Sequence, residues 1–189
     1  MMIKIGVMGS AGGEMPEPVK KLCYELGRQI AMAGCILLTG GCPGLPQEST
    51  RGAKDTGGIT IGISPGLNLS EHVDLYKSPT EDLDVLIFTG SGLMGREVIG
   101  VRSCDIIVIV GGRSGTLGEF AIAYDEGKPI GVLLGTGGIA EEIAGIVEKI
   151  QKPTGSQVFY DTDPARLVKS VVEHFKSQPV TAPRYEAAG

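Results

Sequence analysis

The stretch V-I-V-G-G-R-S-G-T-L-G-E-F, residues 108 to 120, runs a short apolar segment into a glycine-rich turn and then into a segment with helical spacing. A strand, a turn and a helix in that order form the unit from which α/β sheets are built, with the turn at the carboxyl end of the strand. Glycine lacks the Cβ atom that keeps an anion away from backbone N–H groups, and it permits positive φ. This stretch therefore predicts both an α/β fold and a phosphate-binding turn.

The same alternation of short apolar runs and helical segments repeats along the chain. We predict strands at 3–8, 35–39, 59–63, 84–89, 105–110, 129–134 and 157–160. Helices are expected between them, at 18–33, 45–56, 92–103, 115–126, 138–151 and 164–177. This alternation is typical of parallel strands covered by helices on both faces. The predicted fold class is α/β, a three-layer, doubly wound, mainly parallel sheet of six or seven strands.

The length of 189 residues is enough for one domain with a substantial core. We place this single domain at residues 1–178 and a loose C-terminal tail at 179–189, where the apolar content is low. One long polar connection, residues 64–82, is either a lid over a site or an irregular surface loop.

The charge balance and the cysteine pattern limit the function classes. The formal net charge is −5, which argues against nucleic acid as a partner, because neutralising its phosphates requires clustered Lys and Arg. No apolar run is long enough for a membrane span, and the N-terminus does not read as a signal peptide. The four cysteines lack C-x-x-C spacing, which favours neither a zinc site nor a disulfide framework. We therefore expect a cytoplasmic protein with no metal, membrane or nucleic-acid partner.

Three glycine-rich turns follow predicted strands, and parallel strands bring their carboxyl ends to one edge of a sheet. The turns are G-S-A-G-G-E (9–14), T-G-G-C-P-G-L-P (39–46) and G-G-R-S-G-T-L-G-E (111–119). The residues that we predict to bind a phosphate or nucleotide are Gly9, Ser10, Gly40, Gly41, Gly44, Gly111, Gly112, Arg113, Ser114, Gly115 and Thr116. In this prediction the phosphate lies on the amides of residues 112–115 and on the Thr116 hydroxyl.

Two charged residues are candidates for chemistry beside these turns. Arg96, in G-S-G-L-M-G-R-E (90–97), follows the fourth strand and suits a bidentate contact with phosphate. The alternative is an exposed helix arginine paired with Glu97 or Asp105. Glu119 lies one turn into the helix after the third glycine turn, where a carboxylate could equally do no more than complement the helix dipole.

Familiar cofactor motifs are missing. No turn carries G-K-[ST], and the first turn reads G-V-M-G-S-A-G in place of G-x-G-x-x-G, which disfavours a Walker loop and an NAD enzyme. No lysine lies in a context for pyridoxal phosphate. Cys42 is expected to be a small turn residue, although a helix N-terminus could make its thiol reactive. The two histidines, His72 and His174, show no partner spacing and receive no role.

The motifs together resemble a known superfamily. T-G-G-C-P-G-L near the second strand, G-R-E before the fifth strand and G-G-R-S-G-T-L-G-E after it are similar to the Lonely Guy superfamily, often labelled lysine decarboxylases. The run I-G-V-R-S-C-D-I-I-V-I-V-G-G resembles the branch that contains the molybdenum cofactor carrier proteins. The similarity extends over residues 3–135 and implies a Rossmann-like nucleotide-binding fold.

The resemblance implies two alternative functions for a protein that binds a phosphorylated, nucleotide-like ligand. Active Lonely Guy enzymes are phosphoribohydrolases, which hydrolyse the N-glycosidic bond of a nucleoside 5′-monophosphate with an arginine and a glutamate that match Arg96 and Glu119. The carrier proteins hold molybdenum cofactor, a pterin phosphate, without evident catalysis. The chain departs from the enzyme pattern at two places. Gly111-Gly112-Arg113 stands where the enzymes have proline-glycine-glycine, and Glu97 stands where they have lysine. No cofactor is required by either function, although molybdenum cofactor would be the ligand of the second.

The predicted helix 92–103 is apolar on more than one side, which predicts a homodimer or a higher homo-oligomer. A purely structural or interaction role is the third alternative. It leaves the glycines at three strand ends unexplained, because glycine lowers the stability of strands and helices by roughly 0.5–1 kcal/mol per position.

Overall fold

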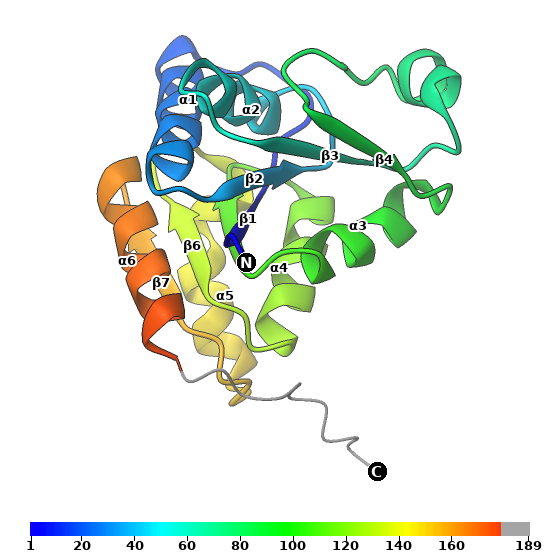
Figure 1. Cartoon of the computed structure of the whole chain (residues 1–189). Coiled ribbons are helices and arrows are strands. Elements are labelled where there is room, and N and C mark those ends of the chain that lie inside the picture. The colour runs from blue at the N-terminus through cyan, green and yellow to red at the C-terminus, as the bar shows by residue number, and fades with distance from the viewer. Residues whose placement is uncertain (179–189) are drawn as a thin grey trace.

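The computed structural model describes residues 1–178 and shows seven parallel strands between two layers of helices (Figure 1). The strands are β1 (Lys4–Gly9), β2 (Ile36–Thr39), β3 (Thr60–Ser64), β4 (Val85–Phe88), β5 (Ile106–Val110), β6 (Ile130–Leu133) and β7 (Val158–Asp161). They lie in the order β4-β3-β2-β1-β5-β6-β7, and every neighbouring pair is parallel. The predicted fold class is confirmed, and each predicted strand lies within one residue of the observed one at both ends.

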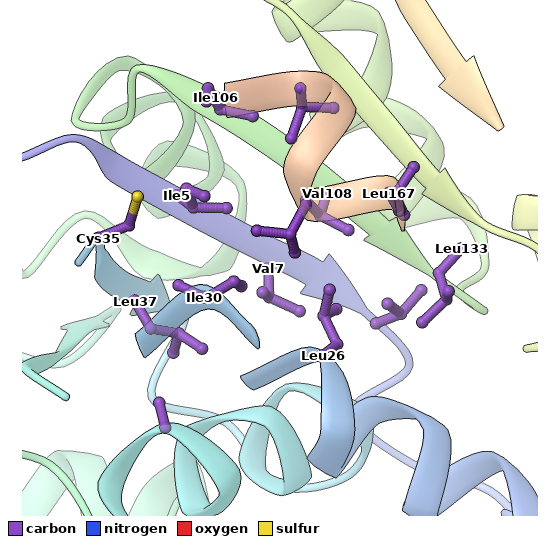
Figure 2. Close-up of a cluster of buried hydrophobic side chains, with 14 of the residues drawn as sticks. Ile5, Val7, Leu26, Ile30, Cys35, Leu37, Ile106, Val108, Leu133 and Leu167 are labelled. Carbon is purple, nitrogen blue, oxygen red and sulfur yellow. The ribbon is translucent and has the colours of Figure 1, made fainter. Parts of the chain in front are cut away.

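Helices form a separate hydrophobic core on each face of the sheet. The first face carries α1 (Glu17–Met32), α2 (Leu45–Asp55) and α6 (Pro164–Ser177), and the second carries α3 (Gly92–Arg102), α4 (Ser114–Asp125) and α5 (Ile143–Ile150). The interior strand β5 serves both cores because successive side chains of a strand point to opposite faces. Ile106 and Val108 pack into the first core, which Figure 2 shows, whereas Ile107 and Ile109 pack into the second.

The chain order places a topological switch point between β1 and β5. The chain begins in the middle of the sheet, proceeds outward from β1 to β4, and then returns to form β5 on the other side of β1. In open parallel sheets ligands bind in the crevice at the carboxyl ends of the two strands on either side of such a point. These two strands end at Gly9 and Val110, so the first and third glycine turns lie next to each other.

The predicted helix at 138–151 is divided in two. The structure has a 3₁₀ turn, η2 (Gly138–Glu141), followed by the shorter helix α5. The reason lies in backbone hydrogen bonding, because the amides of Ile139 and Ala140 donate to the carbonyls of Gly112 and Gly111, at 2.9 and 3.0 Å. The η2 turn thus supports the glycine turn after β5.

The long connection at 64–82 is more ordered than either prediction for it. It contains a short π-helix, η1 (Glu71–Leu75). The side chain of His72, a residue of this helix, is fully buried. The two ring nitrogens of His72 lie 2.9 Å from Ser64 Oγ and 2.9 Å from the Pro79 carbonyl oxygen. His72 therefore fixes both ends of the connection, a structural role that the sequence did not indicate.

Strand β4 is less covered by helices than the other strands of this three-layer fold. This strand lies at the edge of the sheet, and Val85, Ile87 and Phe88 are 46%, 45% and 39% exposed. Val85 and Ile87 pair in register with Ile61 and Ile63, so they extend the face of the second core beyond its helices. The predicted tail at 179–189 lies outside the described residues. Within residues 1–178 no helix combines the length and the apolar character that crossing a membrane requires.

Candidate functional site

Helices α2, α3 and α4 begin at the carboxyl edge of the sheet without a side chain that caps them. In α4 the first intrahelical bond is donated by the Leu117 amide to the Arg113 carbonyl oxygen, at 3.0 Å. The preceding amides, those of Ser114, Gly115 and Thr116, have no acceptor within residues 1–178. Free amides and the positive end of the helix dipole together favour an anion at this position.

A cavity of about 420 Å³ opens at this helix terminus. It is of the size of a small-molecule site, which is about 300–1,000 Å³ in proteins. The predicted site residues that line it are Gly9, Ser10, Gly40, Arg96, Arg113, Ser114, Gly115, Thr116 and Glu119. The other residues that line it are Val7, Met8, Ala11, Cys42, Pro46, Leu93 and Glu97. The structure thus brings together residues from four separate segments of the chain, and their functional roles stay predictions.

Arg96 is a buried cation with unused hydrogen-bonding capacity. Its side chain is 11% exposed, and Nη1 lies 3.6 Å from Glu119 Oε1. Its Nε atom is buried and has no hydrogen-bond partner among the described residues. A Cβ atom on Gly40 would overlap the guanidinium group, so glycine is required there for Arg96 to lie in the cavity. The alternative pairing with Asp105 does not occur, because Asp105 pairs with Lys4 at 2.7 Å.

Glu119 lies opposite Arg96 and is nearly inaccessible to solvent, at 6% exposure. Burial raises the pKa of its carboxyl group to about 7, the charge of Arg96 opposes this increase, and the nearby Glu97 adds to it. A carboxyl group with a pKa near neutrality can either donate or accept a proton under physiological conditions. Glu119 lines the cavity, and its role there stays a prediction.

Glu97 also lines the cavity. The sequence singled it out only because the Lonely Guy enzymes have lysine at this position. It is 8% exposed and lines the cavity, and its carboxylate lies against Gly115 and Gly118 of α4. Burial raises the pKa of its carboxyl group, and Arg96 lowers it. Helical spacing could have shown that the Glu97 side chain points inward. Val101 lies four residues later on the same face of α3 and belongs to the core.

The amides of Gly111 and Gly112, which we predict to contact phosphate, have hydrogen-bond partners within the protein. The Gly112 amide donates to Ser10 Oγ at 2.7 Å, and the Gly111 amide donates to Thr136 Oγ1 at 2.8 Å. Both amides are therefore used within the protein, and neither glycine lines the cavity. Both residues have positive φ, 58° and 98°, so they shape the turn that carries the chain into α4. Thr136, which no sequence motif indicated, holds this turn from the loop after β6.

Two glycines of the second turn also lie outside the cavity. Gly41 packs against His72, and its amide donates to Thr39 Oγ1 at 3.1 Å. Gly44 packs against the Ser10 carbonyl group and lines a neighbouring groove. Cys42, between them, does line the cavity, and burial raises the pKa of its thiol. The raised pKa favours the neutral thiol over a reactive thiolate.

The neighbouring groove has a volume of about 830 Å³ and shares Ala11 with the cavity. It runs between the first glycine turn and the start of α2, and its polar side chains are those of Glu14, Lys20, Gln47 and Glu48. Glu48 pairs with Arg51 at 2.6 Å. Arg113 is exposed at the border between groove and cavity, so its side chain does not crowd the turn. No three His, Cys, Asp or Glu side chains within residues 1–178 are grouped so as to hold a metal ion.

A doubly wound parallel sheet with a cavity at its switch point defines a Rossmann-like α/β protein with a candidate ligand site. The chain belongs to the SLOG cluster4 family, whose model matches residues 2–168. This assignment agrees with the resemblance to the Lonely Guy superfamily and to its molybdenum cofactor carrier branch.

Three solved structures illustrate the similarity. The structural genomics target TM1055 is 27% identical, covers 92% of this chain and 99% of its own, and superposes with a TM-score of 0.79. The molybdenum cofactor carrier protein of Chlamydomonas reinhardtii is 32% identical, covers 94% of this chain and 100% of its own, and has a TM-score of 0.74. The molybdenum cofactor binding protein of Rippkaea orientalis is also 32% identical, with coverages of 91% and 98% and a TM-score of 0.71.

DNA processing protein A of Helicobacter pylori is 18% identical to this chain, with a TM-score of 0.62, over 91% of this chain and 81% of its own. At this level of identity the similarity shows the fold alone.

Proposed function

We propose that this protein binds a phosphorylated small molecule in the cavity at the switch point, with the phosphate at the N-terminus of α4. The observation that carries the proposal is the set of three consecutive amides, Ser114 to Thr116, that lack acceptors and line the cavity. The buried Nε of Arg96, which also lacks a partner, provides a cationic donor in the same cavity. Phosphate oxygens would satisfy both sets of donors.

The ligand class that we favour is a pterin phosphate of the molybdenum cofactor type, held as cargo without reaction. Two relatives with 32% identity are named as a carrier of molybdenum cofactor and as a protein that binds it. The groove beside the cavity supplies room for a ligand larger than a sugar phosphate. Glu97 in place of the lysine of the enzymes also favours binding over catalysis.

A second candidate is a phosphoribohydrolase that acts on a nucleoside 5′-monophosphate. The arrangement that favours it is the Arg96–Glu119 pair, with a carboxyl pKa of about 7. In this reaction Glu119 would position water or stabilise oxocarbenium charge at C1′ of the ribose. Arg96 would hold the phosphate or polarise the leaving purine.

Two measurements separate the carrier from the enzyme. Native mass spectrometry of the purified protein should detect a molybdopterin if the protein is a carrier and a nucleoside monophosphate if it is an enzyme. Incubation with AMP and with N6-isopentenyl-AMP, followed by chromatography, should release no free base if the protein is a carrier. Release of base that disappears in Glu119→Gln, with the fold intact, would contradict the carrier function and establish the hydrolase.

We further propose that a second copy of the chain covers the exposed apolar surface of β4 and α3. Val85, Ile87, Leu93, Met94 and Ile99 are each 40–74% exposed. Together they present on the order of 400 Å² of apolar surface, about half of the ~800 Å² that each partner buries in a standard interface. Leu93 also lines the cavity, so this interface would continue to the mouth of the site. Analytical ultracentrifugation should show an oligomer that becomes a monomer in Ile87→Asp and Met94→Asp.

The remaining expectations are part of the same proposal. We propose that residues 1–178 act as one domain in the cytoplasm and that nucleic acid is not a partner. The net charge of −5 supports the last point. A mobility-shift assay with single-stranded and double-stranded DNA should show no complex at low salt, and a salt-sensitive complex would contradict it.

A further inference from the structure

Glu97 is a largely buried carboxylate for which residues 1–178 supply no hydrogen-bond donor, and its oxygens are not sealed from the cavity. Its side chain is 8% exposed, and it accepts no hydrogen bond from any residue within 1–178. A charged group that is largely removed from bulk water is stable only with a hydrogen-bond donor, and buried polar groups in native proteins are nearly always bonded to protein or to ordered water. Because Glu97 lines the cavity, its donor can come from a water molecule or from a ligand in that cavity.

The position of this carboxylate is fixed by two glycines of α4. Oε1 lies 3.0 Å from the point that a Cβ atom would occupy on Gly115, and Oε2 lies 3.3 Å from the corresponding point on Gly118. A side chain at either position would push against the carboxylate. Gly115 also belongs to the first turn of α4, whose amides lack acceptors. The negative charge of Glu97 therefore lies immediately beside the proposed phosphate position.

The charges that face Glu97 do not neutralise the cavity. Among the described residues that line the cavity, Arg96 on α3 is the cation with a largely buried side chain, and Glu119 on α4 is a second buried carboxyl group. Arg113 lies at the rim with an exposed side chain, and the Cys42 thiol is neutral. Like charges a few ångströms apart repel strongly in a cavity of low dielectric constant. A bare phosphate dianion is thus disfavoured unless the ligand also satisfies Glu97.

We propose that Glu97 is a specificity-determining residue, which rejects simple phosphate anions and admits phosphorylated ligands that place an O–H or N–H donor against its carboxylate. The inference rests on the proposed phosphate site and adds a second requirement to it. In a nucleotide the ribose hydroxyls would supply the donor, and in a pterin phosphate the N–H groups of the ring system would do so. A phosphate ester without such a donor would still meet the free amides and Arg96, but nothing would offset its repulsion from Glu97.

The test compares wild-type protein, Glu97→Gln and the matched control Glu173→Gln, a surface residue of α6, by isothermal titration calorimetry. The probes are methyl phosphate, which lacks a donor, AMP, 2′,3′-dideoxy-AMP and molybdopterin. Glu97→Gln should bind methyl phosphate about tenfold or more tightly than wild type, because one charge of the same sign is removed. It should bind the preferred donor-bearing ligand at least about fivefold more weakly, because a charge-assisted hydrogen bond is lost. The control should match wild type with every probe.

The outcomes distinguish the inference from the function on which it rests. Equal affinity of wild type and Glu97→Gln for methyl phosphate and for the donor-bearing ligands would overturn the role of Glu97 and leave the phosphate site standing. Failure of methyl phosphate to bind either protein would overturn the phosphate site as well. If wild type binds dideoxy-AMP more weakly than AMP, and Glu97→Gln binds the two equally, the ribose hydroxyls are the donors. If Glu97→Gln has a lower affinity than wild type for molybdopterin but not for the nucleotides, the N–H groups of the pterin are the donors.

Discussion

Helices α4 and α6 both begin at the carboxyl edge of the same parallel sheet, but their first turns are completed in different ways. At α6 the Asp163 carboxylate accepts hydrogen bonds from the amides of Ala165 and Arg166, at 2.8 and 3.1 Å. At α4 no side chain takes this position, and the corresponding amides face a cavity. A cap contributes about 0.5–2 kcal/mol to stability, so a chain that supplies one at α6 and omits it at α4 leaves room for a ligand there.

The arginines beside the two helices differ in the same way. Arg166 is an exposed residue that forms ion pairs with Asp161 and Asp163, at 2.7 and 3.2 Å. Arg96 is buried, its contact with Glu119 is longer at 3.6 Å, and its Nε has no partner. The charged groups beside α6 are satisfied by their neighbours, whereas those beside α4 retain unused hydrogen-bonding capacity among the described residues, as the proposed ligand site requires.

The largest expected effect comes from removal of the buried arginine. Arg96→Ala should weaken binding of the phosphorylated ligand about a hundredfold, because it deletes a charged donor and leaves Glu97 and Glu119 uncompensated in the cavity. Arg166→Ala is the matched control and should change affinity less than about twofold, since exposed ion pairs contribute little. Calorimetric titration of both variants measures this difference, and similar losses in both would remove the distinction between the two helix termini.

The next effect concerns the pH dependence of stability. Burial raises the pKa of Glu119 from its ordinary 4.5 to about 7, so the folded state retains a proton that the unfolded state has already lost. The stability from this group is full below pH 4.5 and is lost as the pH rises to about 7, on the order of 3 kcal/mol in total. Glu119→Gln should lack this decrease. Urea unfolding of ligand-free protein across this range checks it, and parallel pH profiles of wild type and variant would contradict it.

A smaller effect is expected when a cap is introduced where the chain lacks one. Arg113→Asp places a carboxylate at the N-cap of α4 and should stabilise the protein by about 0.5–1 kcal/mol in the absence of ligand. The same carboxylate should compete with the phosphate and weaken ligand binding about tenfold. Thermal unfolding and titration together report both changes. Arg113→Asn, a cap without the charge, separates the two contributions, because it should stabilise the helix and weaken binding less.

The smallest effect is the reciprocal change at α6. Asp163→Ala removes the cap and should lower the free energy of unfolding by about 1 kcal/mol. Ligand affinity should remain at the wild-type value, because this helix begins outside the cavity. A change in affinity would contradict this prediction, because it would show that the N-terminus of α6 is energetically coupled to the cavity at α4.

Much of the fold could be predicted from the sequence because its signals are local. Continuous apolar runs mark the buried strands, and Gly34, at φ 70°, marks the end of α1 as expected. The signal failed at 138–151, where amides that would continue a helix bond instead to the turn after β5. At β4 the apolar run correctly marks a strand, but it does not show that the strand lies at the edge of the sheet with exposed side chains.

The site was less accessible to prediction than the fold. The proximity of Arg96 and Glu119 follows from the motif and the parallel topology, and the structure shows it. The occupation of the Gly111 and Gly112 amides depends on Ser10 and Thr136, which lie far away in the sequence. No local pattern encodes such contacts. The burial of His72 could not be predicted from the sequence for the same reason.

The most direct test of the central claim is a titration of ¹⁵N-labelled protein with molybdopterin and with AMP, followed by amide NMR. We predict that at least one of the two ligands shifts the amide signals of Ser114, Gly115 and Thr116 and leaves those of Ala165 and Arg166 unchanged. A ligand that saturates the protein without moving the α4 signals, or the absence of binding by both, would contradict the account.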